Sequence, residues 1–265
     1  MQNRPMMIIG EKKAEFMIFT QLYSSSKGNL YAVTANNGKS LLIECGVVWS
    51  KIMKALGYVT ANIEGCLLTH NHMDHAKAIR DVIKAGINVY STRDNFAALG
   101  IAGERRTVNV LEENVASEVF HPGDDFMVYP FRVKHDAADP VGFLIKADNE
   151  TLLFACDTAY IEQEFKTAFN VIALECSYDK DILETRVHTG DINESLAKRL
   201  WDSHMEKQVC LDYLQKHCNL TKCREIHLLH MSGDNLNKEK TRQEFEDALM
   251  IKTVILSKDA SNATV

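Results

Sequence analysis

Short apolar runs alternate with polar turns along most of the chain, and this pattern predicts a protein rich in strands. Val, Ile, Leu, Phe and Tyr dominate the runs, while Gly, Asn, Asp and Ser mark the turns. The predicted strands are residues 16–22, 30–35, 40–44, 63–69, 88–91, 107–111, 118–120, 126–133, 141–147, 151–155, 171–175, 225–229 and 253–256. Two turns, Asn36-Asn37-Gly38 and Asp148-Asn149, predict hairpins between neighbouring strands.

Other stretches carry apolar residues at helical spacing. These predicted helices are residues 50–56, 74–85, 93–100, 180–223 and 238–249. Gly86 directly follows the second of them and provides a helix stop. Strands followed by helices occur twice along the chain. We therefore predict an α/β fold with four layers, an αββα sandwich, in a single domain over residues 1–265 with its core at about 16–256.

Composition excludes several classes of protein. The chain has 265 residues, of which 46% are hydrophobic and 25% charged, as in an ordinary globular protein. No apolar run approaches the ~18 residues that span a membrane, and the first ten residues are too polar for a secretory signal. The seven cysteines form no CxxC pair and are interpreted as reduced thiols. We expect a cytoplasmic protein without a membrane partner.

The net charge of −6 does not indicate a wholly basic nucleic-acid-binding face. Basic residues do cluster locally, at Arg105-Arg106, at Lys198-Arg199 and between Lys238 and Arg242. Such clusters are most often solvated surfaces of helices or loops. A nuclease would need some of them near its reactive site, where they steer phosphate.

The densest chemistry lies at His70-Asn71-His72-Met73-Asp74-His75, directly after the predicted strand 63–69. Three imidazoles and a carboxylate within six residues read as HxHxDH, a two-metal signature. This ligand set suits Zn²⁺, with Mn²⁺ or Fe²⁺ as alternatives. Two such ions roughly 3.5–4 Å apart can hold a bridging hydroxide and clamp a phosphate or carbonyl group.

Further ligand candidates follow other predicted strands. His135-Asp136 comes after the strand 126–133, Asp157 after 151–155, and His230 after 225–229. A lone His after a strand is more often a hydrogen-bonded structural residue. Together, and downstream of the HxHxDH motif, these side chains complete a dinuclear set, because strand ends place ligands on one rim of a fold.

Most of the chain, from about residue 16 to 256, resembles the metallo-β-lactamase-fold hydrolases, in their YycJ/WalJ-like branch. The matching segments are residues 25–29, 41–46, 68–75, 133–137 with 140–143, 154–158, 175–179 and 228–232, followed by Asn235. The resemblance implies a four-layer sandwich of the metallo-β-lactamase type. It also implies that His70, His72 and His135 hold one metal, that Asp74, His75 and His230 hold the second, and that Asp157 bridges the two.

The remaining histidines are interpreted as structural or exposed. His227 lies three residues before His230 on the same predicted strand and therefore faces the opposite side. His121 is a loop residue, and His188 and His217 are expected in solvent. The resemblance also marks a departure: Glu44 stands where Asp is usual, and that Asp is a hydrogen-bond partner of a metal-bound His.

The predicted reaction uses a metal-bridging hydroxide that attacks phosphorus or a carbonyl carbon, with Asp74 as both ligand and orienter of the water. A leaving alkoxide still needs a proton. His204 occupies the place where related phosphodiesterases carry a further active-site His, and we interpret it as a general acid or phosphate contact. An ordinary His at a helix start is the alternative for His204.

We therefore expect a dinuclear metal-dependent phosphodiesterase or nuclease, such as an exonuclease. Its substrate would be a phosphodiester, including single-stranded nucleic acid or a nucleotide. Two alternatives stay open: a hydrolase of a carbon-oxygen, thioester or lactam bond, and a non-catalytic metal-binding sensor of the same fold. The sequence leaves the oligomeric state open.

Overall fold

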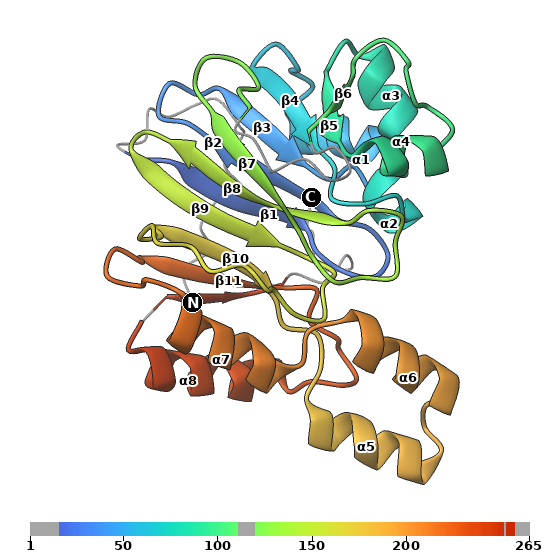
Figure 1. The fold of residues 1–265 in the computed structure, drawn as a ribbon, viewed down its shortest axis with the longest axis vertical. Helices are drawn as coiled ribbons and strands as arrows, with labels where there is room; N and C mark the ends of the chain where they lie inside the picture. The colour runs from blue at the N-terminus through green and yellow to red at the C-terminus, as the bar shows by residue number, and fades with distance from the viewer. Residues whose placement is uncertain (1–15, 111–119, 252, 258–265) are drawn as a thin grey trace.

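The computed structural model describes residues 16–110, 120–251 and 253–257, and it consists of two sheets that face each other with helices outside them (Figure 1). Each sheet has six strands among the described residues. This arrangement confirms the predicted αββα sandwich. Phe19 and Tyr31 of one sheet meet Phe154 of the other, with ring centroids 6.1 and 5.2 Å apart, so the shared core lies between the sheets.

The first sheet is formed by the N-terminal half of the chain. Its strands, in spatial and chain order, are β1 (Ile18–Tyr23), β2 (Leu30–Thr34), β3 (Ser40–Ile43), β4 (Ile63–Leu67), β5 (Val89–Ser91) and β6 (Thr107–Asn109). The first two pairings are antiparallel and the rest are parallel. Its outer face is covered by α1 (Trp49–Ala55), α3 (Ile79–Lys84) and α4 (Arg93–Ala98).

The second sheet is formed by the C-terminal half. Its spatial order is β12 (Val254–Leu256), β11 (Glu225–Leu229), β10 (Val171–Glu175), β9 (Glu150–Ala155), β8 (Val141–Ala147) and β7 (Met127–Arg132). Strands β9 to β12 are mutually parallel, whereas β8 is antiparallel to both β7 and β9. β7 therefore runs in the same direction as β9, and the carboxyl ends of β7, β9, β10 and β11 share one edge.

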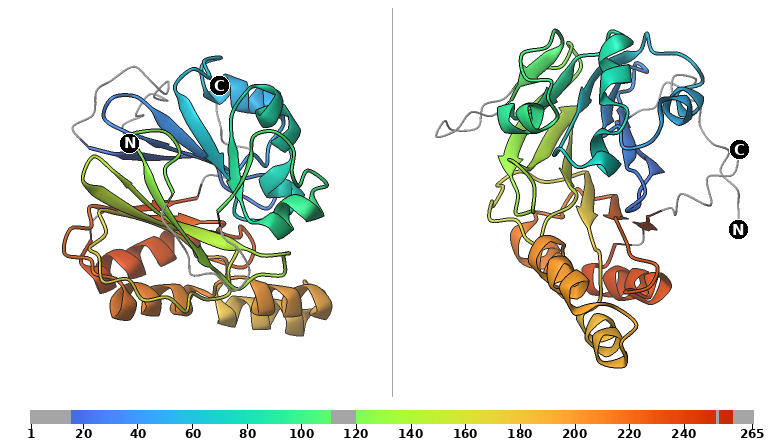
Figure 2. Two further views of the ribbon diagram at one scale, coloured as in Figure 1. Left: turned by 45° about the horizontal axis from the view of Figure 1, so that its top comes forward. Right: turned by 90° about the vertical axis from the view of Figure 1, so that its right-hand side faces the viewer.

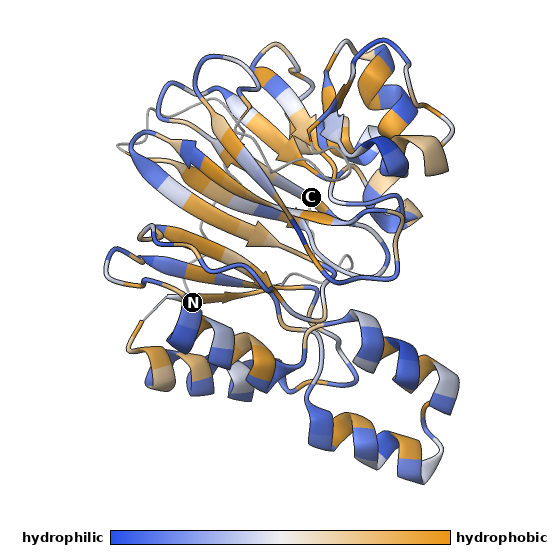
Figure 3. Ribbon diagram, in the orientation of Figure 1, coloured by the Kyte–Doolittle hydropathy of each residue, from blue (hydrophilic) through white to orange (hydrophobic). Residues whose placement is uncertain are grey.

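Helices α7 (Lys207–His217) and α8 (Lys238–Leu249) cover the outer face of the second sheet, where Tyr213, Leu214 and Phe245 are buried. The strands between the layers are predominantly apolar along their length, as expected for strands covered on both faces (Figure 3). Helices α5 (Lys180–Thr189) and α6 (Glu194–Ser203) lie beyond this layer and project from the body as a helical hairpin (Figures 1 and 2). We call this pair the arm.

The stretch 180–223, predicted to be helical, contains three helices. One predicted helix differs from the structure: the helix 74–85 is divided into α2 (Met73–Ala76) and α3. The division has a clear cause. The Asp74 carbonyl accepts the Asn29 N–H at 2.8 Å, and the Ala78 N–H donates to the Cys45 carbonyl at 2.9 Å, so the helical bond between residues 74 and 78 is not formed.

The other predicted elements match the structure to within a few residues at each end, as is usual for helix and strand boundaries. Residue 111 and residues 118 and 119 of two predicted strands lie outside the described residues, and Phe120 forms an isolated bridge with Val128. Within the described ranges, every helix is too short or too polar to cross a bilayer.

Candidate metal centre

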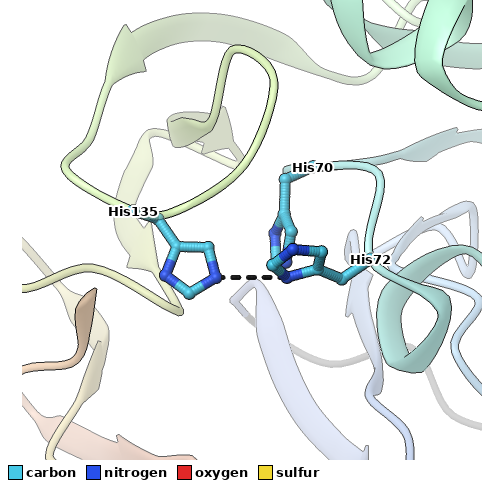
Figure 4. Close-up of side chains that lie close together, drawn as sticks. All are labelled: His70, His72 and His135. Atoms are coloured by element: carbon cyan, nitrogen blue, oxygen red, sulfur yellow. Dashed lines mark hydrogen bonds between the residues drawn. The ribbon is translucent and has the colours of Figure 1, made fainter. Parts of the chain in front are cut away.

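The HxHxDH motif lies where β4 ends and the chain turns into α2, facing the carboxyl edge of the second sheet. His70 is fully buried, and its Nδ1 lies 2.9 Å from the Thr69 hydroxyl. His72 approaches His135, which follows β7, with 3.3 Å between His72 Nδ1 and His135 Nε2 (Figure 4). The His135 Nδ1–H donates to the Ser203 carbonyl at 2.8 Å, so Nε2 is the ring nitrogen that could act as a ligand. The Asp136 Oδ1 lies 3.1 Å from the same Nε2.

Asp157, directly after β9, is the centre of this cluster. Its Oδ2 lies 3.2 Å from His75 Nε2, 3.7 Å from His135 Nε2 and 3.9 Å from His70 Nε2, and its Oδ1 lies 3.8 Å from His230 Nε2. Asp157 and His230 both have left-handed backbones, with φ of 52° and 51°. Non-glycine residues adopt this conformation at a cost of order 1–3 kcal/mol, and such residues are found at active sites as well as in turns.

Glu44 faces the Nδ1 atom of His75, whereas Asp157 faces its Nε2 atom. Its Oε1 lies 3.2 Å from His75 Nδ1 and accepts a hydrogen bond of 2.5 Å from the Thr69 hydroxyl. The longer side chain found here in place of Asp therefore still reaches an imidazole of the motif. The Asn29 amide nitrogen lies 3.0 Å from His75 Nε2, on the side of the ring that faces Asp157.

A second carboxylate, Glu175 at the end of β10, faces the Nδ1 atoms of two other histidines. Its Oε1 lies 2.7 Å from His204 Nδ1 and 3.6 Å from His230 Nδ1, and its Oε2 accepts the Thr158 N–H. The rings of His204 and His230 are stacked, with centroids 5.2 Å apart. His204 is the C-cap residue of α6, directly after its last residue Ser203, so the arm places this side chain at the centre.

Sequence reasoning gave Glu175 no role, although its segment was among those that carried the resemblance. The feature that could have identified Glu175 is its place at the end of β10, where the other four residues are apolar. The contact between His135 and the Ser203 carbonyl could not be predicted from the sequence, because any residue type can offer a backbone carbonyl as acceptor.

Burial and charge act together on the pKa values of the centre. Burial lowers the pKa of His70 well below its ordinary value, and burial likewise lowers that of His135 against the pull of Asp157. Burial also lowers the pKa of His75, but the carboxylates of Asp157 and Glu44 outweigh it and hold this pKa well above the usual range. His230 and His75 keep the pKa of Asp157 low although burial raises it. A buried carboxylate is thus kept ionised among imidazoles.

The side chains fit divalent metal ions. Three groups have ligand atoms within 4.8 Å of one another: His70 with His72 and His135; His70 with His75 and Asp157; and Asp157 with Glu175, His204 and His230. Within the described part of the chain, His70 Nε2 and His230 Nε2 are buried without a hydrogen-bond partner. Buried polar atoms are rarely left unpaired, and a metal ion would satisfy both nitrogens.

Asp74 is the predicted ligand that lies at the margin of the cluster. It belongs to none of the three groups, and its Oδ2 lies 3.7 Å from His75 Nε2 with 29% of the side chain exposed. Its role as a ligand stays a prediction based on the resemblance. The carboxylate lies at the open side of the cluster, where solvent has access.

The other histidines lie outside the centre. His227 is buried against the ring of Phe19, with centroids 4.7 Å apart, and its Nδ1 lies 3.0 Å from the Gln21 amide nitrogen. His121 and His188 are exposed. His217, the last residue of α7, forms an exposed ion pair with Glu164. The structure thus places His227 on the face of β11 opposite to the one predicted for ligands.

Gly46 is expected to be essential for the position of α2. A Cβ atom at residue 46 would lie 1.6 Å from the Asp74 carbonyl oxygen and 2.8 Å from the Asn29 nitrogen, both of which are backbone atoms. We therefore expect Gly46→Ala to lower the free energy of unfolding by about 3 kcal/mol, measured by urea denaturation. Gly233→Ala is the control, because a Cβ there meets nothing within 4 Å. Equal denaturation midpoints for the two variants would contradict this account.

Comparison with known proteins supports the fold seen here. The sequence profile of the metallo-beta-lactamase superfamily matches residues 26–200. Exodeoxyribonuclease YycJ of Bacillus anthracis is 26% identical over 249 residues, which cover 87% of this chain and 88% of that protein. The crystal structure of Zn²⁺-bound PqqB from Methylobacterium extorquens superposes with a TM-score of 0.68 at 15% identity, covering 91% of this chain and 97% of the other. That of a diphosphatase from the PhnP family does so with a TM-score of 0.63 at 16% identity, covering 92% and 95%.

Proposed function

Because this chain belongs to the metallo-beta-lactamase superfamily, we propose that it is a metal-dependent hydrolase of phosphodiester bonds. The observation that carries the proposal is Asp157, an ionised and buried carboxylate within 3.9 Å of imidazole nitrogens that come from β4, β7 and β11. A purely structural core would not collect so many polar groups without pairing them, because unpaired buried polar atoms are costly.

The proposed metal ligands follow the sequence prediction. His70, His72 and His135 would hold one ion, Asp74, His75 and His230 the other, and Asp157 would lie between them. Imidazole and carboxylate ligands suit zinc, with manganese or iron as alternatives. When bound, such ions lower the pKa of a coordinated water and neutralise charge that develops on a phosphoryl group.

The residues of the chain prepare this site in two ways. The carboxylates of Glu44 and Glu175 face the Nδ1 atoms of His75 and His230, which directs the Nε2 atoms toward Asp157. His204 Nδ1 is turned to Glu175, so the ring can present its Nε2 proton to a leaving oxygen. Burial lowers the pKa of His204, but Glu175 outweighs it and raises the pKa to about 9. Without bound metal His204 therefore holds its proton at neutral pH, and we propose it as the general acid.

A phosphodiester substrate is supported by the relatives. YycJ of B. anthracis carries the name of an exodeoxyribonuclease and is similar over most of its length, and the PhnP-family structure is described as a diphosphatase. We propose that the substrate is single-stranded nucleic acid or a nucleotide. We further propose that the chain forms one domain and acts in the cytoplasm, which agrees with seven cysteines that are all free thiols in the structure.

Metal analysis combined with a hydrolysis assay tests the proposal. We expect the purified protein to contain two divalent ions per chain and to cleave bis-p-nitrophenyl phosphate. A chelator should remove both the metal and the activity, and Zn²⁺ or Mn²⁺ should restore activity. A metal-loaded protein that leaves this ester intact but opens a β-lactam or a thioester would establish the alternative hydrolase. A metal-loaded protein inactive on all three would favour a sensor.

A further inference from the structure

A hollow of about 400 Å³ lies beside the candidate metal centre, and His135 belongs to both. The His135 side chain itself is fully buried in the centre. One side of the hollow is the loop after β7, with Lys134 and Asp136. The other side is α6, with Lys198 and Arg199. A volume of this size falls in the range of small-molecule sites, about 300–1,000 Å³. We call this hollow the arm cavity.

The arm cavity is lined by three basic residues, Lys134, Lys198 and Arg199, and by two acidic ones, Asp136 and Asp202, so basic residues outnumber acidic ones by one. Lys198 pairs with Asp202 at 2.7 Å and Arg199 pairs with Asp136 at 2.8 Å, but the two basic side chains are 72% and 54% exposed. Ion pairs this exposed are weak, so a phosphate can compete for both cations. The pair with Asp136 uses Arg199 Nε, and the guanidinium has further N–H donors to offer. Over the described ranges, Lys134 has no ion-pair partner.

This is the one place where a basic cluster singled out in the sequence meets the centre. Arg106 donates to Asn88 at the far edge of the first sheet, and the cluster between residues 238 and 242 lies on α8, where Arg242 pairs with Glu239 (Figure 1). Lys198 and Arg199 instead share a cavity with His135. A chain of phosphates that reaches the metal centre would pass them.

The spacing between the arm cavity and the centre is held by hydrogen bonds. The last residue of α6, Ser203, accepts the His135 Nδ1–H at its carbonyl, and the next residue is His204. On the other side, the Ala159 N–H donates to the Lys134 carbonyl at 2.8 Å.

We propose that the arm cavity binds the phosphodiester linkage next to the one that is cleaved. The substrate is then a single-stranded polynucleotide rather than a small cyclic phosphodiester. This inference rests on the proposed phosphodiesterase function and adds to it the substrate class and the residues that select it.

The test compares a long and a small substrate across matched variants. Lys198→Ala and Arg199→Ala are assayed on a single-stranded oligodeoxynucleotide and on bis-p-nitrophenyl phosphate. Lys180→Ala is the control for the first, since Lys180 forms an exposed i,i+4 pair with Glu184 on the same arm but outside the cavity. Arg80→Ala is the control for Arg199→Ala, since Arg80 lies on α3 and forms an exposed ion pair with Glu104.

We expect the ratio of kcat/KM on the oligonucleotide to kcat/KM on the small ester to fall about tenfold in each cavity variant, mainly through KM. The slope of log KM against log salt should also decrease by about one for each cation removed. Both controls should keep the wild-type ratio and slope.

Three outcomes would overturn the inference. Equal losses on both substrates would mean that the cavity residues act only through the fold of the centre. Equal ratios in cavity variants and controls would mean that the cavity does not touch the substrate. A wild-type protein that cleaves a cyclic dinucleotide and the small ester but not the oligonucleotide would overturn this inference alone, whereas a protein inactive on every phosphodiester would overturn the proposed function as well.

Discussion

Replacement of Asp157 by Asn is expected to remove metal from the protein and to lower phosphodiesterase kcat/KM by about a thousandfold, or ~4 kcal/mol of transition-state stabilisation. The amide has nearly the same shape as the carboxylate, so the change tests charge rather than packing. The lost charge matters because both carboxylate oxygens face imidazole nitrogens, at 3.2 to 3.9 Å. A neutral amide offers one oxygen and one N–H₂ group, so it would hold the proposed metal ions less well than a carboxylate.

Metal content by elemental analysis and kcat/KM by bis-p-nitrophenyl phosphate hydrolysis measure the two effects. Asp212→Asn is the matched control, since it makes the same chemical change at an exposed residue of α7 that pairs with Lys216. The control should retain both metal and activity. An Asp157→Asn protein with the full metal content and near wild-type activity would remove Asp157 from the centre of the mechanism.

Replacement of His204 by Ala is expected to lower kcat by about 10²–10⁴-fold while the metal content stays at the wild-type level. The expected loss reflects a missing proton donor for the leaving oxygen. Metal retention is the decisive part of the result, because Glu175, His204, His230 and Asp157 lie close enough together to hold an ion themselves. If the variant loses one metal ion per chain, His204 is a ligand and not an acid.

The pH dependence of kcat gives a second readout for His204. Burial alone would lower its pKa, and Glu175 raises it to about 9, so the proton is present at neutral pH and is lost as the pH rises through that value. The wild-type rate should therefore fall on the alkaline side. Cations bound beside the ring would move this fall to lower pH without removing it. His204→Ala should lack the alkaline fall, whereas His217→Ala, a change at an exposed histidine on α7, should keep it. An unchanged alkaline fall in the His204 variant would assign it to another group.

Much of the fold and most of the candidate centre follow from local pattern. The strands were predictable because their apolar runs are short and end at turn residues, and the ligand candidates because they stand directly after those strands. His227 could be separated from His230 by the two-residue period of a strand, and the structure packs His227 against Phe19 on the other side of β11. These are properties that a few neighbouring residues impose on their own backbone.

The prediction of one helix over residues 74–85 was wrong because distant residues, not neighbouring ones, decide the backbone there. Its sequence has continuous helical spacing, but the Asp74 carbonyl and the Ala78 N–H are bonded to residues 29 and 45, which are distant in the chain. Competition from such partners leaves no mark on the local pattern. The limited approach of Asp74 to the cluster was equally out of reach, since it depends on how Gly46 and Asn29 hold α2.

Local residue order was thus sufficient for the two-sheet architecture and for a set of candidate ligands dominated by one hexapeptide, because backbone periodicity and donor chemistry act over short range. The assignment of these candidates to two metal ions came from the resemblance and stays a prediction. The contacts that surround the candidates came from long-range packing. Glu175 reaches His204 and His230, the Ser203 carbonyl orients His135, and Lys198 and Arg199 face a cavity next to the centre. The contact of Glu175 with His230 depends on the pairing of β10 with β11. The other contacts depend on where the arm docks against the second sheet, and that position is the sum of many weak contacts between segments far apart in the chain.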